Sequence, residues 1–473
     1  MKPNKIIEPW KGDKRWTDMA ARAAKLKKTG LSAEQIVAAI GAEFGPPPQI
    51  AQLDVQPKPY TVIGELGLDI EPAALAQLEL ALRLPVAVRG ALMPDAHPGY
   101  ALPIGGVFAA QRAVAPAMVG VDIGCRMHLT IFAEPAQQLL ARRAELFADL
   151  QAVTVFGAGG SRDRQADHSI LDGERWQLTA QTRDLRDKAA RQLGTSGSGN
   201  HFAELVIGER MSPLLPRSHE LPRSHEATKE QQAEHFSEPS HLRDFVAKLP
   251  AQFCALLTHS GSRGVGYAIA NHYIRLAQQE TERHTKVPRM YEWLDLAGQA
   301  GQEYWQAMQL AGDFAQANHE VIHALFARRA KLTPLAVVQN HHNFAWLHGD
   351  MVIHRKGATP AGAGELGIIP GSMASASYLV AGRGSEAALW SASHGAGRLG
   401  SRTQARSRST LAEARRVMQH ADILVEGLSV DEAPHAYKDI ERVIQLQVEA
   451  DMITPLATMR PIAVIMAGEA GDE

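Results

Sequence analysis

The stretch Ser391-Ala-Ser-His-Gly-Ala-Gly-Arg398 sets one histidine among residues that are too small to cover it. Glycines let a backbone approach a ligand closely, and their N–H groups can face phosphate oxygens. The imidazole of His394 can attack phosphorus, and the guanidinium of Arg398 suits bidentate recognition of a phosphate. A glycine turn with an incidental histidine would have the same letters. The stretch alone leaves a phosphate-handling site and a plain turn both open.

The composition is that of an ordinary globular protein. The 473 residues are 45% hydrophobic and 21% charged, and 49 basic residues nearly balance 51 acidic ones. A nucleic-acid partner would therefore need a local basic patch. Two cysteines cannot build a disulfide framework, the first residues lack the apolar core of a signal peptide, and no apolar run reaches membrane-spanning length. These features predict a cytoplasmic protein without a membrane partner.

The pattern of elements predicts an α+β fold, a single mixed-sheet catalytic domain with a short helical N-terminal extension. Residues 1–50 form the extension and its proline-rich linker, in which Ser32 and Gln35 match a capping box. Strand-like runs alternate with helical ones through residues 51–473. Residues 206–245 are polar and contain a tandem duplication, which indicates an insertion loop. Because candidate site residues are spread along most of the chain, one catalytic domain is favoured over several.

Several cysteine, histidine and aspartate residues beside glycine turns are candidate metal ligands. Asp122 and Cys125 lie three apart on a tight turn, where a carboxylate and a thiolate could share one ion, but a buried structural cysteine fits the same pattern. His259 ends an apolar strand-like run, and Arg263 follows in a glycine loop, which suits metal and anion binding respectively. Further candidates follow glycine-rich or polar runs, namely Asn200, His201, Glu204 and the stretch Asn340-His-His-Asn343.

A second histidine pattern, His319-Glu-Val-Ile-His323, matches the helical motif of zinc metalloproteases. No clear third ligand follows, and the flanking residues are those of an amphipathic helix with a basic end, so we disfavour this hypothesis. The chain also lacks a serine nucleophile elbow, a P-loop and the lysine motif of nucleotidyltransferases. Glycine loops with a Cys/His/Asp set and an exposed histidine suit phosphoryl or nucleotidyl transfer on divalent metal.

Nine motifs, taken in order, resemble the RtcB family of RNA-splicing ligases over nearly all of residues 60–468. They are MPDAHPG, VGVDIGC, LGTSGSGNHFAE, HSGSRG, HHN, RKGA, IPGSM, SHGAGR and APHAYKDI. The resemblance implies a GTP-dependent RNA ligase with two Mn²⁺ ions, which joins RNA 2′,3′-cyclic phosphate or 3′-phosphate ends to 5′-hydroxyl ends through a histidine–GMP intermediate, in tRNA splicing or RNA repair. The alternatives are a metal-dependent RNA-end phosphatase or cyclic phosphodiesterase, and a non-catalytic RNA-binding paralogue.

The resemblance also implies roles for individual residues. His394 would be guanylylated, while Asp95, Arg263 and Arg398 would serve the phosphate and the catalytic environment. The metal ligands would be Asp122, Cys125, His201, His259 and His342, with Cys125 bridging. The nucleotide would contact Asn200, Glu204, Asn343, Ser372, Ser377, Gly395, Gly397 and Tyr437. Ala467 stands where the family has a lysine that reads guanine. Which RNA is joined, whether an activating protein is needed and the oligomeric state stay open.

Overall fold

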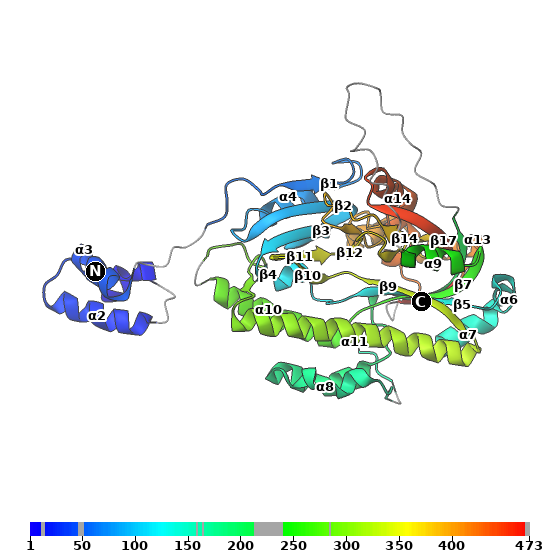
Figure 1. Cartoon of the computed structure of the whole chain (residues 1–473), viewed down its shortest axis with the longest axis horizontal. Helices are drawn as coiled ribbons and strands as arrows, with labels where there is room; N and C mark the ends of the chain where they lie inside the picture. Colours follow the sequence, from blue (N-terminus) through cyan, green and yellow to red (C-terminus); the bar gives the residue numbers. More distant parts are fainter. Residues whose placement is uncertain are drawn as a thin grey trace, which may run out of the picture.

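The computed structural model describes residues 1–10, 15–45, 52–157, 159–162, 165–211, 240–282 and 285–468 (Figure 1). Helices and strands are both abundant within these ranges, and they confirm the predicted α+β class. Most of the predicted insertion lies outside the described residues, and its two flanks continue a strand and begin a helix. None of the helices in the described ranges is long and apolar enough to cross a membrane.

The N-terminal extension has a hydrophobic core of its own. It contains α1 (Pro3–Ile6), the 3₁₀ turn η1 (Glu8–Trp10), α2 (Trp16–Lys28) and α3 (Ala33–Phe44). The predicted capping box is confirmed, because Ser32 Oγ accepts the Gln35 N–H at 3.2 Å and the Gln35 side chain accepts the Ser32 N–H at 2.9 Å. The core side chains are Ile6, Ile7, Trp10, Met19, Ala23, Ile36 and Ile40.

The larger of the two main sheets has eight strands. Its order is β13, β14, β17, β6, β7, β5, β9; these neighbours are antiparallel, while β16 pairs with β17 in parallel. The strands are β5 (Arg126–Phe132), β6 (Gly199–Arg210), β7 (Gln252–Ser260), β9 (Pro334–His341), β13 (Leu366–Ile369), β14 (Ser377–Gly382), β16 (Leu424–Glu426) and β17 (Ile453–Ala467).

A five-stranded mixed sheet lies beside it, in the order β1, β2, β3, β11, β10 (Figure 1). Its strands are β1 (Tyr60–Val62), β2 (Ala87–Tyr100), β3 (Leu102–Gln111), β10 (Phe344–His348) and β11 (Met351–Lys356). Two short ribbons join β12 (Ala358–Pro360) to β15 (Ser391–Ser393), and β4 (Ala113–Val114) to β8 (Leu294–Asp295).

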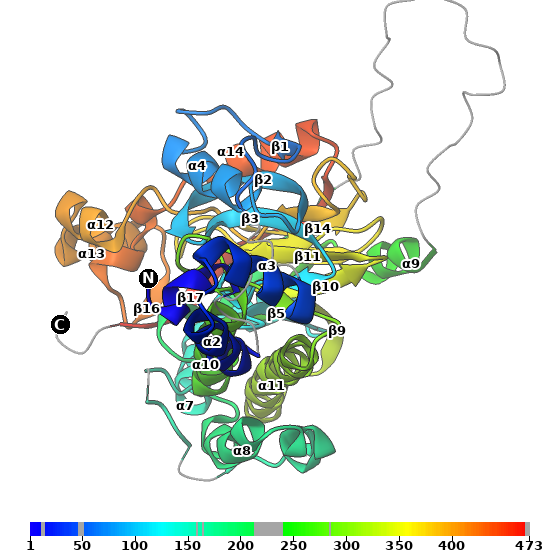
Figure 2. The ribbon, with the colours of Figure 1, turned by 90° about the vertical axis from the view of Figure 1, so that its left-hand side faces the viewer.

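Helix α11 (Gln299–Ala330) runs along one side of the molecule, beside α10 (Arg263–Thr281) (Figures 1 and 2). Its apolar face is buried, with Phe326 packed on Phe132 of β5. The other helices are α4 (Pro72–Ala81), α5 (Pro116–Val119), α6 (Ala136–Ala141), α7 (Arg143–Val153), α8 (Ala180–Gln192), α9 (Ser240–Lys248), α12 (Arg402–Arg408), α13 (Leu411–His420) and α14 (Ile440–Glu449).

The register of the large sheet brings four chain segments to one edge. His259 near the end of β7 pairs with Met127 of β5 on one side and with Phe202 of β6 on the other. Arg126 at the start of β5 pairs with His341 at the end of β9. The residues next to these positions therefore come together, although they lie far apart in the sequence.

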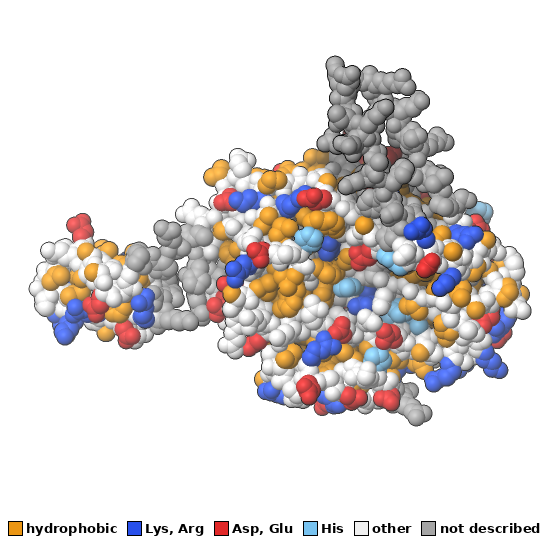
Figure 3. Space-filling model, in the orientation of Figure 1, with side chains coloured by type: hydrophobic (Ala, Val, Ile, Leu, Met, Phe, Trp, Pro, Cys, Tyr) orange, Lys and Arg blue, Asp and Glu red, His pale blue; other side chains and the backbone are white. Residues whose placement is uncertain are grey.

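Charged side chains are interspersed on the face seen in Figure 3, where lysines and arginines stand among aspartates and glutamates. This mixture agrees with the near-balance of basic and acidic residues in the whole chain. A phosphate-bearing ligand is therefore expected to depend on groups inside a site rather than on a broad field.

Candidate active site

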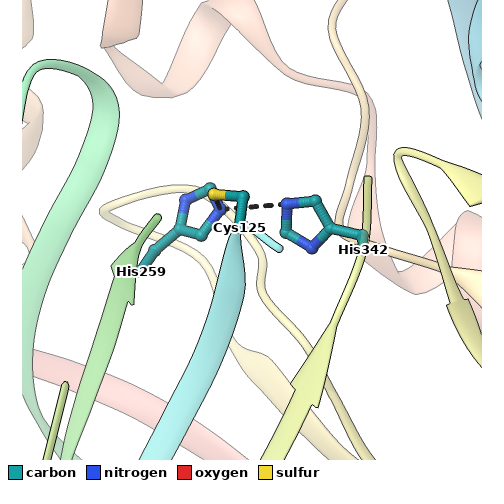
Figure 4. A group of neighbouring side chains, drawn as sticks. All are labelled: Cys125, His259 and His342. Atoms are coloured by element: carbon teal, nitrogen blue, oxygen red, sulfur yellow. Dashed lines mark hydrogen bonds between the residues drawn. The ribbon is translucent and has the colours of Figure 1, made fainter. Parts of the chain in front are cut away.

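Four predicted ligands lie at the strand ends on this sheet edge. Cys125 directly precedes β5, His201 is near the start of β6, His259 is near the end of β7, and His342 directly follows β9. Figure 4 shows Cys125, His259 and His342 turned toward one another. Cys125 Sγ lies 3.2 Å from His259 Nε2 and 3.4 Å from His201 Nε2, and His259 Nε2 lies 3.2 Å from His342 Nε2.

The donor atoms form two sets that share the cysteine. One set is Cys125, His259 and His342, and the other is Asp122, Cys125 and His201. The arrangement fits two divalent cations that share a thiolate, with imidazoles and one carboxylate completing the donors.

The ring orientations of the two central histidines direct their lone pairs into the cluster. His201 Nδ1 donates to the Ser196 carbonyl at 2.7 Å, and His259 Nδ1 donates to the Asn200 carbonyl at 3.1 Å. A neutral imidazole that donates through Nδ1 carries its lone pair on Nε2. His201 Nε2 then faces Asp122 Oδ2 at 3.1 Å, acceptor against acceptor, which calls for a cation between them.

Burial favours the neutral imidazoles that a metal needs, but it disfavours the thiolate of Cys125. It lowers the pKa of His259 to about 3, and it lowers the pKa of His342 well below the ordinary value, so both imidazoles are neutral. Burial and the charge of Asp122 raise the pKa of Cys125 well above its ordinary value. A thiolate at this position therefore requires a bound cation to hold it.

His394 stands beside this cluster and is oriented by a buried carboxylate. Its Nδ1 donates to Asp95 Oδ2 at 2.7 Å, and its backbone N–H donates to the same oxygen at 3.2 Å. Asp95 is fully buried, whereas His394 lines the cavity described below. The hydrogen bond through Nδ1 leaves the lone pair on Nε2. The rings of His394 and His342 lie 5.0 Å apart, centre to centre.

A glycine is required three residues after His394, within the stretch that the sequence singled out. Gly397 has a φ of +76°, and a Cβ at this position would lie 2.2 Å from the Asp95 carbonyl oxygen. The close approach of these two segments is what brings the Asp95 carboxylate under the imidazole.

A cavity of about 620 Å³ opens over both His394 and the cluster. Of the eight residues predicted to contact a nucleotide, all line it: Asn200, Glu204, Asn343, Ser372, Ser377, Gly395, Gly397 and Tyr437. Apolar side chains of Phe202, Met373, Val464 and Met466 line it as well. Burial raises the pKa of Glu204 to about 8. The cavity thus combines an apolar wall with a few fixed polar groups, as small-molecule sites do.

The two predicted arginines differ in what they face. Arg398 lines the cavity, and its guanidinium donates to Glu432 Oε2 at 3.1 Å and to the Asp431 carbonyl at 2.7 Å. Arg263 is buried in the glycine loops instead, where Nε donates to Thr195 Oγ1 at 3.1 Å and Nη2 donates to the Gly157 carbonyl at 2.9 Å.

Glu432 and His97 are polar residues of this cavity that sequence reasoning did not assign to the site. Glu432 accepts from Arg398 and from the Tyr437 hydroxyl, and it also lies 2.6 Å from an Arg402 nitrogen. His97 lines the cavity and approaches the Asp95 carbonyl through Nδ1. No spacing pattern marks Glu432, whereas His97 lies inside a motif that had already been singled out.

The HEVIH histidines form a separate cluster behind the strands. His319 and His323 are buried on α11, and both contact the hydroxyl of Thr258, at 2.5 Å and 2.8 Å. His323 Nδ1 also contacts Thr130 Oγ1 at 2.7 Å. No carboxylate or thiolate joins His319 and His323 in a metal-like group among the described residues.

Comparison with known proteins identifies the family. The family model described as "tRNA-splicing ligase RtcB" matches residues 77–467. The chain is 29% identical to the RNA-splicing ligase RtcB of Escherichia coli K12, over 84% of this chain and 95% of that protein. It is 32% identical to RNA-splicing ligase RtcB2 of E. coli ATCC 25922 (86% and 95%), and 29% identical to the tRNA-splicing ligase RtcB of Thermococcus kodakarensis (79% and 86%). The resemblance found in the motifs is thereby confirmed, and the chain belongs to the RtcB family.

Proposed function

We propose that this protein is a GTP- and Mn²⁺-dependent RNA ligase, which joins RNA 2′,3′-cyclic phosphate or 3′-phosphate ends to 5′-hydroxyl ends through a guanylylated His394. The observation that carries the proposal is the orientation of His394. Its Nδ1 is committed to Asp95, its Nε2 lone pair is left for the cavity, and the Cys/His/Asp cluster adjoins it. An imidazole held in this tautomer is a nucleophile rather than a general acid.

The first step would be attack of His394 Nε2 on the α-phosphorus of GTP. A P–N bond forms, the bond between the α-phosphorus and the bridging oxygen breaks, and pyrophosphate leaves with the electron pair. The imidazole becomes cationic, and the Asp95 carboxylate at 2.7 Å stabilises that charge. Asp122, Cys125, His201, His259 and His342 would hold the two cations. When bound, such cations neutralise phosphate charge and make phosphorus more electrophilic.

The later steps use the same cavity. The RNA 3′-phosphate, which a cyclic phosphate yields after hydrolysis, attacks the phosphorus of the His394–GMP bond and takes the GMP, so the imidazole is restored. The RNA 5′-hydroxyl then attacks the 3′-phosphate and displaces GMP, which gives a phosphodiester. Arg398 lines the cavity and is positioned by Glu432 and the Asp431 carbonyl, so it is available to neutralise phosphate oxygens there.

Intact-mass analysis after incubation with GTP and Mn²⁺ tests the proposal. The wild-type protein should gain the mass of one GMP, and His394→Ala should gain none. His420→Gln is the control, because His420 is an exposed histidine at the end of α13 that does not line the cavity, and it should keep the adduct. An adduct on the His394→Ala protein would disprove the assignment. Loss of 3′-phosphate from RNA without any adduct would favour the RNA-end phosphatase instead.

A further inference from the structure

Two consecutive residues of α11 hold the loop that follows His259. Asn318 is fully buried, and its Nδ2 donates to the Gly261 carbonyl at 3.1 Å. His319, also fully buried, contacts the Ser260 carbonyl through Nε2 at 3.2 Å. A carbonyl can only accept, so His319 Nε2 carries the proton, and its Nδ1 accepts from Thr258 Oγ1.

Asn318 also reaches the loop that leads to His201. Its Oδ1 accepts the Gly194 N–H at 2.8 Å, so one side-chain amide joins the two loops through both of its polar atoms. The loops meet again closer to the cluster, where Ser260 Oγ donates to the Ser196 carbonyl at 2.6 Å. That carbonyl is also the acceptor for His201 Nδ1.

The same contacts reach the carboxylate of the cluster. A Cβ added at Gly261 would lie 2.1 Å from Asp122 Oδ1, so the backbone at Gly261 is pressed against the Asp122 side chain. A shift of the loop after His259 would therefore move His259 and the Ser196 carbonyl that accepts from His201. It would also change the contact between Gly261 and Asp122. Outer contacts of this kind orient metal ligands and tune their affinity.

We propose that Asn318 and His319 are positioning residues for the metal site, which fix the spacing of the two loops so that His201 and His259 converge on Cys125. The inference rests on the proposed metal site. It gives His319, the first histidine of the HEVIH motif, a role that is neither metal ligation nor proteolysis.

His323, one turn further along α11, offers a matched control. It is buried like His319 and shares the Thr258 hydroxyl, but its other contact is Thr130 in the middle of β5 rather than a loop. Replacing it removes comparable buried hydrogen bonds without touching the loop backbone. A purely structural role for this face of α11 predicts equal effects at His319 and His323, whereas positioning predicts unequal ones.

Titration of the purified protein with Co²⁺ alone separates these possibilities. A thiolate ligand to Co²⁺ gives a charge-transfer band, and its coordination geometry sets the visible bands. We expect Asn318→Leu and His319→Leu to weaken Co²⁺ binding about 10- to 100-fold and to alter the visible bands. His319→Gln should restore both, since its amide can donate to Ser260. His323→Leu should lower the Tm comparably and keep the Co²⁺ affinity within about twofold.

Three outcomes would overturn the proposal. One is unchanged Co²⁺ affinity and spectrum in folded Asn318→Leu and His319→Leu. Another is a loss of affinity in His323→Leu as large as in His319→Leu. If Asn318→Leu does not fold, Asn318→Asp replaces it, because the aspartate keeps an acceptor for the Gly194 N–H but places an oxygen against the Gly261 carbonyl. The third outcome is wild-type Co²⁺ affinity in the Asn318→Asp variant. Absence of the charge-transfer band from the wild-type protein would instead disprove the metal site itself.

Discussion

Two histidine clusters lie on opposite sides of the same strands, and they differ in where their lone pairs point. In the first, His201 and His259 donate through Nδ1 to backbone carbonyls, so both Nε2 lone pairs face Cys125. In the second, His319 donates through Nε2, and its only lone pair accepts from the Thr258 hydroxyl. Because the single Thr258 proton is then used, His323 must donate to Thr258 through Nε2 and accept from Thr130.

The difference shows that spacing of histidines does not define a metal site. The HEVIH pair has the letters of a zinc motif, yet each lone pair in it is satisfied by a threonine. The first cluster has no continuous motif, since its ligand residues come from four strand ends, yet the Nε2 lone pairs of His201 and His259 converge on Cys125. A hydrogen-bond acceptor left facing other acceptors indicates a cation, and a closed chain of donors excludes one.

The largest effect is expected from the atom that the two donor sets share. Cys125→Ala should weaken Mn²⁺ or Co²⁺ binding on the order of 100-fold or more and abolish the His394 adduct, because each donor set loses its thiolate. Elemental analysis and intact-mass measurement check this. Cys254→Ala is the matched control: Cys254 is the other buried cysteine, in the core of β7, so its loss should cost about 1 kcal/mol of stability and leave metal unchanged. Metal retained in Cys125→Ala would remove the basis of the comparison.

The second largest effect is expected at the carboxylate that sets the tautomer of His394. Asp95→Asn keeps a side chain of the same size but removes the charge that stabilises an imidazolium. Its amide can also donate to Nδ1, which would move the imidazole proton to Nε2. We expect adduct formation to slow by on the order of 10²–10⁴-fold while metal content stays normal. Single-turnover kinetics with labelled GTP measure the rate. An unchanged rate would show that Asp95 does not orient the nucleophile.

Strand ends were the most informative part of the sequence, for a physical reason. The apolar run that stops at His259 marks where a buried strand reaches the edge of a sheet, and in the structure β5 begins directly after Cys125 and β9 ends directly before His342, so polar side chains there can meet. What the local sequence cannot encode is the partner of each donor. The Arg263 side chain turned to Thr195 and Gly157, not to the cavity, and Glu432 entered the site through contacts with Arg398 and Tyr437. The division of the chain into a 1–50 extension and one catalytic domain with a 206–245 insertion stays a prediction.

A smaller effect is expected near Glu204, where we propose that the base binds. Glu204 pairs with Val464 of β17, three residues before Ala467, and a register shift after Met466 breaks the strand alternation there. By resemblance Ala467 replaces a donor for guanine O6. Ala467→Lys should therefore widen the GTP-over-ATP ratio of adduct formation by about ten- to a hundredfold. Ala467→Met supplies length without charge and should leave the ratio unchanged. An equal ratio in the lysine and methionine variants would mean that position 467 does not face the base.

The smallest effect on chemistry is expected from the closed cluster, where His323→Leu should leave metal content and adduct formation unchanged. It should nevertheless lower the free energy of unfolding by about 1–3 kcal/mol, because the Thr130 and Thr258 hydroxyls each lose a buried partner.

Burial holds the pKa of His323 well below its ordinary value of 6.5. Below about pH 6.5, His323 therefore binds a proton in the unfolded chain but not in the native state. Its contribution lowers the free energy of unfolding as the pH falls. Removing it should make the loss of stability between pH 7 and pH 5 shallower, by up to about 1.4 kcal/mol per pH unit. Denaturant unfolding of the wild-type and His323→Leu proteins at several pH values measures this. Equal slopes of the unfolding free energy against pH would mean that His323 is protonated in the native state, contrary to a cluster in which every lone pair is satisfied.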